Sequence, residues 1–500
     1  MLELMLNKNK KTKVIIAGGG TSGWIAAAAL SKQMGKMLDI TLVESDAIGT
    51  IGVGEASIPP MRVFHQLLGI DEQEFMRATN ATFKLGISFE NWGQINDKYI
   101  HSFGTTGQES FLAGFHHFWL HSLTKGFDAE FGEYCVELQA AKANKFATSE
   151  KSNINYAYHL DATRYAAYLR TFSEAKGVKR VEGKINQVSQ NPQTEFITAL
   201  TLDNGKTLEG DFFIDCTGFR GLLIEQTLNT GYEDWSHWLP CDSAVAVQTE
   251  ATGELKPYTR SIAHASGWQW QIPLQHRTGN GLVYCSKYLS DDDAKALLLK
   301  NITGKAINEP IIIKYRTGKR RQSWNKNCVA LGLSSGFVEP LESTSIYLFM
   351  MGIIRLMRLF PDGSVQQSSI DEYNKQTNSE LEKIRDFIIL HYHATERNDS
   401  PFWRYCKNMT IPETLKHRID IFRDNAQAFQ ADGELFRVDS WTQVMLGQRI
   451  KPASYHPIVR TMSDNELKQF LNGYRAQVQQ VVNNLPSHQA FIEQYCKAKE

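Results

Sequence analysis

The sequence has few cysteines, and none of them forms a paired motif. Seven cysteines are scattered singly over 500 residues, and their number is odd. A disulfide framework or a cysteine-based metal site usually places cysteines in pairs at short spacings. We therefore expect neither, and we predict a reducing, cytoplasmic location.

An excess of charge of either sign is also absent. The chain has 54 basic and 54 acidic residues, and its formal net charge is zero. Without a global electrostatic field, neither nucleic acid nor an anionic membrane is an expected partner.

Long hydrophobic runs are missing as well. Residues 14–30 are apolar and follow a basic stretch at residues 8–13, and this order of a basic and an apolar segment is similar to that of a signal peptide. Glycines at positions 18–20 and 23 interrupt this run, and a phosphate-binding turn explains them better than a signal peptide does. No other segment approaches the roughly 20 apolar residues of a membrane span.

The composition that remains is that of a globular protein. It is 42% hydrophobic and 22% charged, and its length suggests one large domain with insertions or two closely joined domains. The chain opens with a predicted strand at residues 14–17, a helix at 21–32 and a strand at 39–44, a β-α-β unit.

Later segments predict a mixture of helices and strands. The helices are expected at residues 59–68, 71–79, 111–123, 161–176, 291–300 and 345–359, and through much of the chain after 361. Asp203-Asn204-Gly205 predicts a hairpin turn, and residues 101–107 are expected to form a polar loop.

The sequence GGGTSG at positions 18–23 fits the GxGxxG fingerprint between a strand and a helix. Gly18 permits the tight turn, Gly20 lets the backbone approach a pyrophosphate, and Gly23 lets helix and strand pack closely. The free N–H groups at the start of the helix, at Thr21 and Ser22, favour phosphate. Glu44 ends the second strand, where a carboxylate can accept hydrogen bonds from ribose hydroxyls.

FAD fits this site better than NAD. The segment FFIDCTG at positions 212–218 resembles the second nucleotide-contacting segment of FAD-dependent hydroxylases, and no second GxGxxG is present to hold a nicotinamide nucleotide. Reduced flavin would then come from another protein, or hydride from a transiently bound donor.

Lys84 and Glu342 are candidates for chemistry, although each also has a simpler interpretation. Lys84 is surrounded by apolar residues, which would lower its pKa and make it a nucleophile or a tunable donor, but a surface lysine is the commoner outcome. Glu342 could act as a general base or only cap the following helix. The backbone of residues 343–345 could bind an anion.

Two further segments have open interpretations. The glycine-rich loop GVGEASIP at positions 52–59 can lie against a ligand or simply connect two elements. Trp268 and Trp270 lie at strand spacing on one face, where aromatic pairs usually belong to the core.

His116, His117 and His121 have no third ligand at metal-site spacing, so we expect packing or surface histidines and no metal site.

Together these segments resemble the flavin-dependent tryptophan halogenase family. The matching motifs are GGGTSGW at 18–24, GVGEA at 52–56, FK at 83–84, WQWQIP at 268–273 and EPLEST at 339–344; supporting matches are YHLDA at 158–162, DCTGFRG at 215–221 and SPFW at 400–403. The likeness covers nearly the whole chain, and the WxWxIP element separates these halogenases from flavin monooxygenases with the same cofactor fold.

The resemblance implies an α/β fold with an FAD-binding Rossmann-like, hydroxylase-like module. This module would span residues 1–360, with substrate-site segments inserted at about 95–150, and a helical module at 361–500 would pack on it. The implied FAD contacts are Gly18, Gly20, Thr21, Ser22, Gly23, Glu44, Ile51, Val53, Glu55, Ala56, Val188, Leu333 and Ile346.

The resemblance also implies a reaction. FADH2 and oxygen would convert a chloride or bromide ion, bound near the backbone of Thr344 and Ser345, to hypohalous acid. That acid would pass through an internal tunnel to Lys84, which would hold it by hydrogen bonding or as a haloamine. Glu342 would assist halogenation and take up the ring proton.

The remaining implied residues surround the substrate and the flavin. His101, Phe103 and Pro340 would contact an electron-rich ring, and Trp268 and Trp270 would line the flavin side and hinder direct oxygenation of the substrate. A separate flavin reductase would supply FADH2 by diffusion, and the protein is a possible homodimer.

Two departures from the family pattern bear on the substrate. Ser345 stands where many free-tryptophan halogenases have glycine, and the region 429–452 has Trp441 but no Tyr-Tyr-Glu run to hold an amino-acid group. Free indole, another small arene or tryptophan in a peptide are therefore as plausible as free tryptophan. The rival functions are an FAD monooxygenase that hydroxylates an aromatic substrate and a non-enzymatic flavoprotein.

Overall fold

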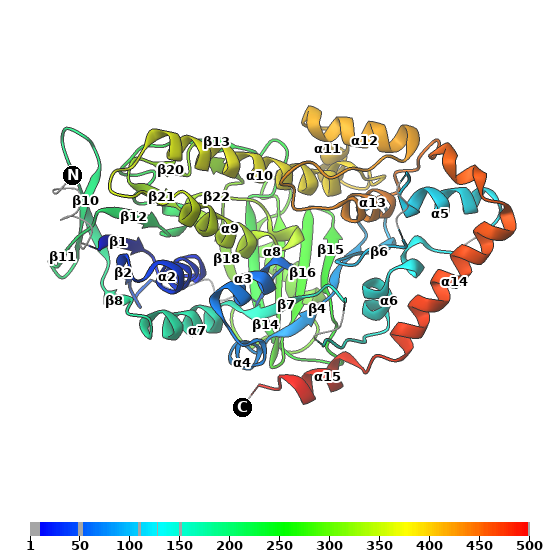
Figure 1. The fold of residues 1–500 in the computed structure, drawn as a ribbon, viewed down its shortest axis with the longest axis horizontal. Coiled ribbons are helices and arrows are strands. Elements are labelled where there is room, and N and C mark those ends of the chain that lie inside the picture. The colour runs from blue at the N-terminus through cyan, green and yellow to red at the C-terminus, as the bar shows by residue number, and fades with distance from the viewer. Residues whose placement is uncertain (1–10, 49–53, 109–111, 128, 150–152, 499–500) are drawn as a thin grey trace.

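The computed structural model describes residues 11–48, 54–108, 112–127, 129–149 and 153–498. Figure 1 shows an elongated molecule with a parallel sheet near the N-terminus, a larger mixed sheet at its centre and helices at the opposite end. The predicted α/β class is confirmed.

The N-terminal sheet has six strands in the order β20-β21-β12-β1-β2-β8, of which all neighbours except β20 and β21 are parallel. Its strands are β1 (Thr12–Ala17), β2 (Leu38–Glu44), β8 (Lys179–Glu182), β12 (Phe212–Asp215), β20 (Trp324–Asn325) and β21 (Cys328–Ala330). In β1 the apolar residues Val14, Ile15, Ile16 and Ala17 are all buried. A strand covered on both faces needs such a continuous apolar run.

Ile197, Leu200 and Leu202 pack on one face of this sheet, against Ile15 and Ala17, and helices cover the other face. They are α2 (Thr21–Met34), α7 (Ala162–Glu174), α9 (Ser345–Arg358) and the long α10 (Gln367–His393). The four consecutive alanines of α2, at positions 26–29, are fully buried, and α2 packs against both α7 and α9. Small side chains let these helices approach closely.

The central sheet has seven strands in the order β18-β14-β17-β16-β15-β5-β6. They are β5 (Gly86–Glu90), β6 (Lys98–Ser102), β14 (Ser243–Glu250), β15 (Thr259–His264), β16 (Gly267–Pro273), β17 (Arg277–Tyr284) and β18 (Ile311–Lys314), with α8 (Asp291–Asn301) on one side. The predicted polar loop at residues 101–107 is partly wrong, because its first two residues continue β6. His101 and Ser102 pair with Ile87 and Gly86 of β5.

A small sheet connects the two large ones. It consists of β3 (Gly54–Ala56), β7 (Ala157–Asp161) and β4 (Thr82–Lys84), in the order β3-β7-β4. β7 therefore places Glu55 and Lys84 on its two neighbouring strands. Between β3 and β4 the chain forms the helices α3 (Pro60–Leu68) and α4 (Glu72–Ala78). Their ends lie within one residue of the predicted ranges 59–68 and 71–79.

Two peripheral sheets have three strands each. They are β9 (Ile185–Gln190), β10 (Ile197–Leu202) and β11 (Thr207–Glu209), and β13 (Tyr232–Asp234), β19 (Gly318–Arg320) and β22 (Gly336–Phe337). The predicted hairpin turn at Asp203-Asn204-Gly205 joins β10 to β11, and Gly205 has a positive φ of 82°.

The chain after residue 360 is mainly helical, as predicted. Besides α10 it forms α11 (Pro401–Asn408), α12 (Glu413–Asn425), α13 (Val438–Gly447), α14 (Asp464–Asn483) and α15 (His488–Tyr495). α14 and α13 lie beside α5 (Phe115–Thr124), α6 (Val136–Lys142) and β6 at one end of the molecule (Figure 1). The largest buried apolar cluster contains residues from both sides of residue 360. The proposed module boundary itself stays a prediction.

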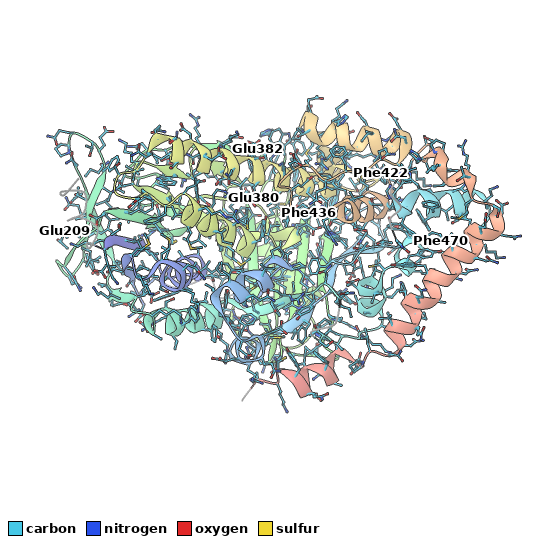
Figure 2. The ribbon with its side chains drawn as sticks, viewed as in Figure 1. Glu209, Glu380, Glu382, Phe422, Phe436 and Phe470 are labelled. Atoms are coloured by element: carbon cyan, nitrogen blue, oxygen red, sulfur yellow. The ribbon has the colours of Figure 1, made fainter. Side chains whose placement is uncertain are left out.

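Buried polar contacts fix α10 against α9. Arg355 Nη2 of α9 donates to Glu380 Oε2 of α10 at 2.8 Å, and the hydroxyl of Tyr347 donates to the other oxygen at 2.7 Å. Figure 2 labels Glu380 on the side of α10 that faces α9. These contacts hold the helix whose C-terminal end reaches the candidate site. Within the described ranges, no helix is long and apolar enough to cross a membrane.

The glycine at position 23 is expected to be essential for the first β-α-β unit. A Cβ atom at Gly23 would lie 1.9 Å from the carbonyl oxygen of Gly18, whereas one at Gly20 would meet no atom within 4 Å. We predict that Gly23→Ala lowers the free energy of unfolding by about 2 kcal/mol or more in chemical denaturation without ligand. Gly20→Ala, the matched control, should change it by less than about 1 kcal/mol. Equal effects of the two variants would contradict this packing.

Candidate active site

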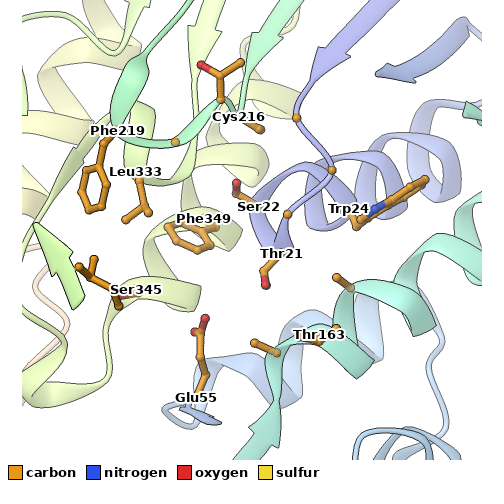
Figure 3. A pocket seen from close by; sticks show the side chains of 18 of the residues that line it. Thr21, Ser22, Trp24, Glu55, Thr163, Cys216, Phe219, Leu333, Ser345 and Phe349 are labelled. Carbon is orange, nitrogen blue, oxygen red and sulfur yellow. The ribbon is translucent and has the colours of Figure 1, made fainter. Parts of the chain in front are cut away.

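A cavity of about 570 Å³ extends from the glycine fingerprint to the start of α9. Its walls come from the turn between β1 and α2, from β3, α7 and β16, from the segment after β12 and from the turn before α9. Figure 3 shows the labelled residues of this lining. A cavity of this volume is of ordinary size for a ligand or cofactor site. Segments far apart in the sequence therefore share one enclosed space.

The fingerprint has the geometry that a bound dinucleotide requires. Gly18 has a φ of 109°, and a Cβ atom there would lie 2.2 Å from the carbonyl oxygen of Cys216. Gly20, Thr21 and Ser22 line the cavity, and no side chain caps the N-terminus of α2. The amide groups of this helix end are thus left for a ligand's phosphates. Gly23 lies behind the turn and packs against Gly18.

Glu44 lies at the cavity wall at the end of β2. Its carboxylate accepts hydrogen bonds from Arg180 Nε and from Trp24 Nε1, the latter at 3.3 Å. These donors orient the carboxylate, and its remaining lone pairs are available to ribose hydroxyls.

Three of the other predicted FAD contacts line the same cavity. Glu55, Ala56 and Leu333 belong to its walls, and burial raises the pKa of Glu55 to about 7. Figure 3 shows Glu55 pointing into the cavity across from Thr21. Four predicted contacts do not line this cavity in the described structure. Val188 lines a separate pocket along β9, Ile346 is buried in α9 outside the cavity lining, and Ile51 and Val53 lie outside the described residues.

The turn between residues 339 and 345 separates this cavity from a second group of polar residues. Pro340, Leu341, Ser343 and Ser345 line the cavity, whereas Glu342 lies outside its lining. Ser343 has a φ of 60°, so the chain reverses sharply just before α9 begins at Ser345. The Oγ1 atom of Thr344 is fully buried and has no hydrogen-bond partner within the described part of the chain.

Lys84 is fully buried on the far side of this turn. Its Nζ donates to Ser343 Oγ at 2.7 Å and to the carbonyl oxygen of Ser57 at 3.1 Å, and it lies 5.3 Å from the centre of the Phe103 ring. Burial lowers the pKa of Lys84 to about 7, although the charge of Glu342 raises it in part. The surface interpretation is therefore wrong, and the reactive role of Lys84 stays a prediction.

Glu342 is also buried and does not cap a helix. Its two oxygens lie 3.0 and 2.8 Å from His101 Nδ1, and its Oε1 lies 2.9 Å from His391 Nε2. Burial alone would raise the pKa of Glu342, but His101 and His391 together lower it to about 2. The carboxylate is thus ionised and held between two imidazole rings.

The two tryptophans of β16 line the cavity beside the turn. Trp268 and Trp270 have ring centres 6.1 Å apart, and Trp268 Nε1 donates to Glu339 Oε2 at 3.0 Å. The hydroxyl of Tyr392 donates to the same oxygen at 2.6 Å, and burial raises the pKa of Glu339 to about 7. Sequence reasoning assigned no role to Glu339, to Tyr392 or to the side chain of Ser343. Glu339 and Ser343 belong to the EPLEST motif, and that motif was the available signal.

The region 429–452 packs against the second polar group through Phe436, Gln443 and Gln448. Phe436, labelled in Figure 2, stacks on Phe387 of α10 with ring centres 3.7 Å apart, and its ring centre lies 6.3 Å from that of His101. Trp441 is buried in α13 and its Nε1 donates to Glu434. Aromatic side chains thus surround His101 and Glu342.

The three histidines of α5 form hydrogen bonds with the segments that contain Ala426, Tyr455 and His456. His116 bonds the carbonyl oxygen of Ala426, and His121 bonds the hydroxyl of Tyr455. His117 accepts from the backbone N–H of His456 at 3.1 Å. They serve packing and hydrogen bonding in the structure.

Comparison with known proteins identifies the family. The tryptophan halogenase family model matches residues 13–464. The chain belongs to this family. Tryptophan 7-halogenase RebH from Lentzea aerocolonigenes is 32% identical over 527 residues, covering 97% of this chain and 99% of RebH.

Solved structures of halogenases have the same fold. Xcc4156, a flavin-dependent halogenase from Xanthomonas campestris, has a TM-score of 0.96 and 52% identity, covering 98% of this chain and 99% of that one. BrvH, a flavin-dependent halogenase from Brevundimonas sp. BAL3, has a TM-score of 0.93 and 44% identity, with coverage of 97% and 99%. The protein is accordingly a flavin-dependent halogenase, an oxidoreductase that uses FADH2 and a halide ion. These findings favour the halogenase over the hydroxylase and over a flavoprotein without activity.

The titration of Lys84 in this halogenase is directly measurable. We predict that one lysine Nζ titrates near pH 7 in an NMR titration of lysine-labelled protein, and that this signal is absent from Lys84→Met. Because the pKa is lower in the folded state than in the unfolded state, the folded state binds fewer protons between about pH 7 and 10.5. The wild type should therefore gain stability relative to Lys84→Met as the pH rises through this range. Titration of every lysine near 10.5 would contradict the burial of Lys84.

Proposed function

We propose that Lys84 delivers an electrophilic halogen to a buried aromatic ring and that Glu342 accepts the ring proton. The observation that supports this proposal most strongly is the position of Ser343. Ser343 belongs to the cavity wall, and its side chain also accepts the hydrogen bond from Lys84 Nζ. The turn thus connects the flavin cavity with the buried polar group of Lys84, His101 and Glu342, which contains its own base.

Each of the two compartments would perform a separate part of the reaction. Bound FADH2 supplies, with oxygen, the oxidising equivalents that convert halide to hypohalous acid. The residues that would hold the cofactor are those of the fingerprint together with Glu44, Glu55, Ala56 and Leu333. The start of α9, with the backbone of Thr344 and Ser345 and the buried Thr344 hydroxyl, suits a halide ion.

Lys84 and Glu342 would complete the reaction on the other side of the turn. Lys84 holds the hypohalous acid by hydrogen bonding or as a haloamine and presents the halogen to the ring. If Lys84 holds the acid by hydrogen bonding, a carbon–halogen bond forms as the oxygen–halogen bond breaks, and the Lys84 ammonium group gives a proton to the departing hydroxide. If a protonated haloamine forms first, the ammonium group takes the halogen with release of water, and the nitrogen–halogen bond breaks as the carbon–halogen bond forms, which leaves neutral Lys84. In both cases the ring proton then leaves for Glu342, the electrons of the carbon–hydrogen bond restore the aromatic ring, and water is the second product.

The substrate that suits this site best is a small, uncharged, electron-rich arene such as indole. The rings of Phe103, Phe387 and Phe436 gather around the polar residues, and region 429–452 places Trp441 in the core. His101, Phe103 and Pro340 stay our proposed ring contacts. Chloride and bromide are both proposed halides, and a separate flavin reductase and a homodimer remain proposals for its partners.

The roles of the lysine and the glutamate can be separated by mutation. With a flavin reductase, bromide and indole, Lys84→Ala should lower ring bromination by at least about a hundredfold while FADH2 oxidation continues. Glu342→Gln should lower it by a similar factor, since positioned acid–base groups contribute about 10²–10⁴-fold. Mass spectrometry of the product and stopped-flow absorbance of the flavin measure the two processes. Bromination by Lys84→Ala at the wild-type rate would refute the assigned role, and an oxygenated product without bromide would indicate a hydroxylase.

The substrate proposal has its own test. Indole should be halogenated with a higher kcat/KM than free tryptophan, by about tenfold or more, because burying an unpaired ammonium or carboxylate group is costly. Liquid chromatography of paired reactions at equal concentrations, together with a tryptophan-containing peptide, measures this preference. A higher kcat/KM for free tryptophan would overturn it.

A further inference from the structure

Three carboxyl groups line the flavin cavity, and one of them differs from the other two. Glu44 accepts a hydrogen bond from Arg180 Nε, and Asp46 Oδ1 accepts one from Arg180 Nη2 at 2.7 Å. Glu55 is partly buried, and its side chain has no hydrogen-bond donor or cation as a partner within the described part of the chain. Without a donor to stabilise a negative charge, the protonated form of this carboxyl group is favoured.

The small sheet places Glu55 in the cavity. In β3 it pairs with Leu160 of β7, and Figure 3 shows its carboxyl group pointing into the cavity, between Thr21 and Ser345. Thr21 belongs to the fingerprint that would hold the phosphates of the cofactor, and Ser345 starts α9, where we propose the halide. The carboxyl group therefore faces the space in which flavin, oxygen and halide would meet.

The titratable groups around Glu55 do not offset the effect of burial, which raises its pKa to about 7. On α7, Tyr165 bonds to His65 of α3 at 2.9 Å, and burial raises the pKa of Tyr165 and lowers that of His65 to about 3, so both are neutral. On β7 and β17, which pack against β3, Asp161 and Arg277 form an ion pair at 2.7 Å. The cations of the cavity lining are Arg170, Lys184 and Arg220.

Oxidation of the halide needs a proton in this cavity. FADH2, oxygen, a halide ion and one proton give FAD, hypohalous acid and water. Oxygen takes up two electrons from FADH2 and two from the halide, its oxygen–oxygen bond breaks, and an oxygen–halogen bond forms. FADH2 supplies two of the three hydrogens in the products, and an acid has to supply the third. The competing oxidation of FADH2 by oxygen to hydrogen peroxide takes up no proton.

We propose that Glu55 is a third catalytic residue, the acid that supplies the proton taken up when the halide is oxidised. Its carboxyl group gives this proton to the oxygen atom that leaves as water, and it regains a proton from solvent afterwards. The inference rests on the proposed function in one respect, that the halide is oxidised in this cavity. It does not depend on the roles of Lys84 and Glu342.

The proton on Glu55 can be observed without turnover. In ¹³C-glutamate-labelled protein, the carboxyl signal of Glu55 is assigned by its loss in Glu55→Asp. This signal should titrate near pH 7 without cofactor and should still be that of a protonated acid at pH 6 with FAD bound. An ionised carboxylate at pH 6 in the FAD-bound protein would overturn the proposal.

Two matched variants test the role of Glu55 in the reaction. With a flavin reductase and bromide but no arene, a halogen-reactive trap in excess measures hypobromous acid, and a peroxidase assay measures hydrogen peroxide. Glu55→Gln keeps the shape of the side chain but has no acidic proton, and it should lower the ratio of hypobromous acid to hydrogen peroxide by about a hundredfold. Glu55→Asp keeps an acid on a shorter side chain and should lower this ratio by less than about tenfold. Fluorescence quenching of FAD measures cofactor binding by both variants.

The pH dependence of the same ratio gives a second test. In the wild type the ratio should fall by about tenfold between pH 6 and pH 8, because Glu55 loses its proton as the pH rises through 7. It should be independent of pH in Glu55→Gln. Because Lys84 titrates in the same range, the profile is repeated in Lys84→Ala, where the fall should persist. The wild-type and Lys84→Ala profiles test the proposal even where Glu55→Gln does not bind FAD.

The outcomes that contradict the proposal differ from a failure of the proposed function. A wild-type product ratio in Glu55→Gln would show that Glu55 supplies no proton, and equal losses in Glu55→Gln and Glu55→Asp would show a role in packing alone. A fall with pH that disappears in Lys84→Ala, or that persists in Glu55→Gln, would assign the titration to another group. A wild-type enzyme that oxidises FADH2 but forms no hypobromous acid at any pH would refute the proposed function, while the ¹³C signal would still decide the protonation of Glu55.

Discussion

The hydrogen bond from Lys84 Nζ to Ser343 Oγ is the contact on which the arrangement of the site depends. It joins the small sheet that carries Lys84 to the turn that starts α9, although the two residues are far apart in the sequence. The same turn is the boundary of the flavin cavity. One hydrogen bond therefore fixes the distance between the compartment that would oxidise the halide and the compartment that would use it.

Burial gives the charged groups of the second compartment unusual properties. Burial lowers the pKa of Lys84 to about 7, and contacts with His101 and His391 lower the pKa of Glu342 to about 2. A lysine that loses its proton easily beside a carboxylate that keeps its charge suits the transfer of an electrophile followed by loss of a proton. α10 contributes to this balance through His391 and holds Glu339 through Tyr392. The C-terminal helices thus complete the site as well as cover it.

The sequence predicted the local parts of the structure well. The fingerprint glycines, the first β-α-β unit and the hairpin turn depend on short-range geometry, which residue type determines directly. Three local interpretations differed from the structure: the surface position of Lys84, the helix-capping role of Glu342 and the loop at His101. Their partners, Ser57 and Ser343 for Lys84 and His101 and His391 for Glu342, come from distant segments, and no local pattern could show that these segments meet. His101 was predicted to lie in a loop. It belongs to a strand instead, because it pairs with Ile87 of β5, and this contact too could not be seen from the local sequence. The family resemblance supplied what local reasoning could not.

The central claim is that the turn at residues 339–345 keeps flavin and substrate apart and that Lys84 connects them. A crystal structure with FAD, bromide and indole, with the bromide located by its anomalous signal, tests this most directly. The account predicts FAD in the cavity of the glycine fingerprint, bromide at the start of α9, and indole on the other side of the turn beside Lys84 and Glu342. Indole bound in the FAD cavity, in contact with the flavin, would contradict it.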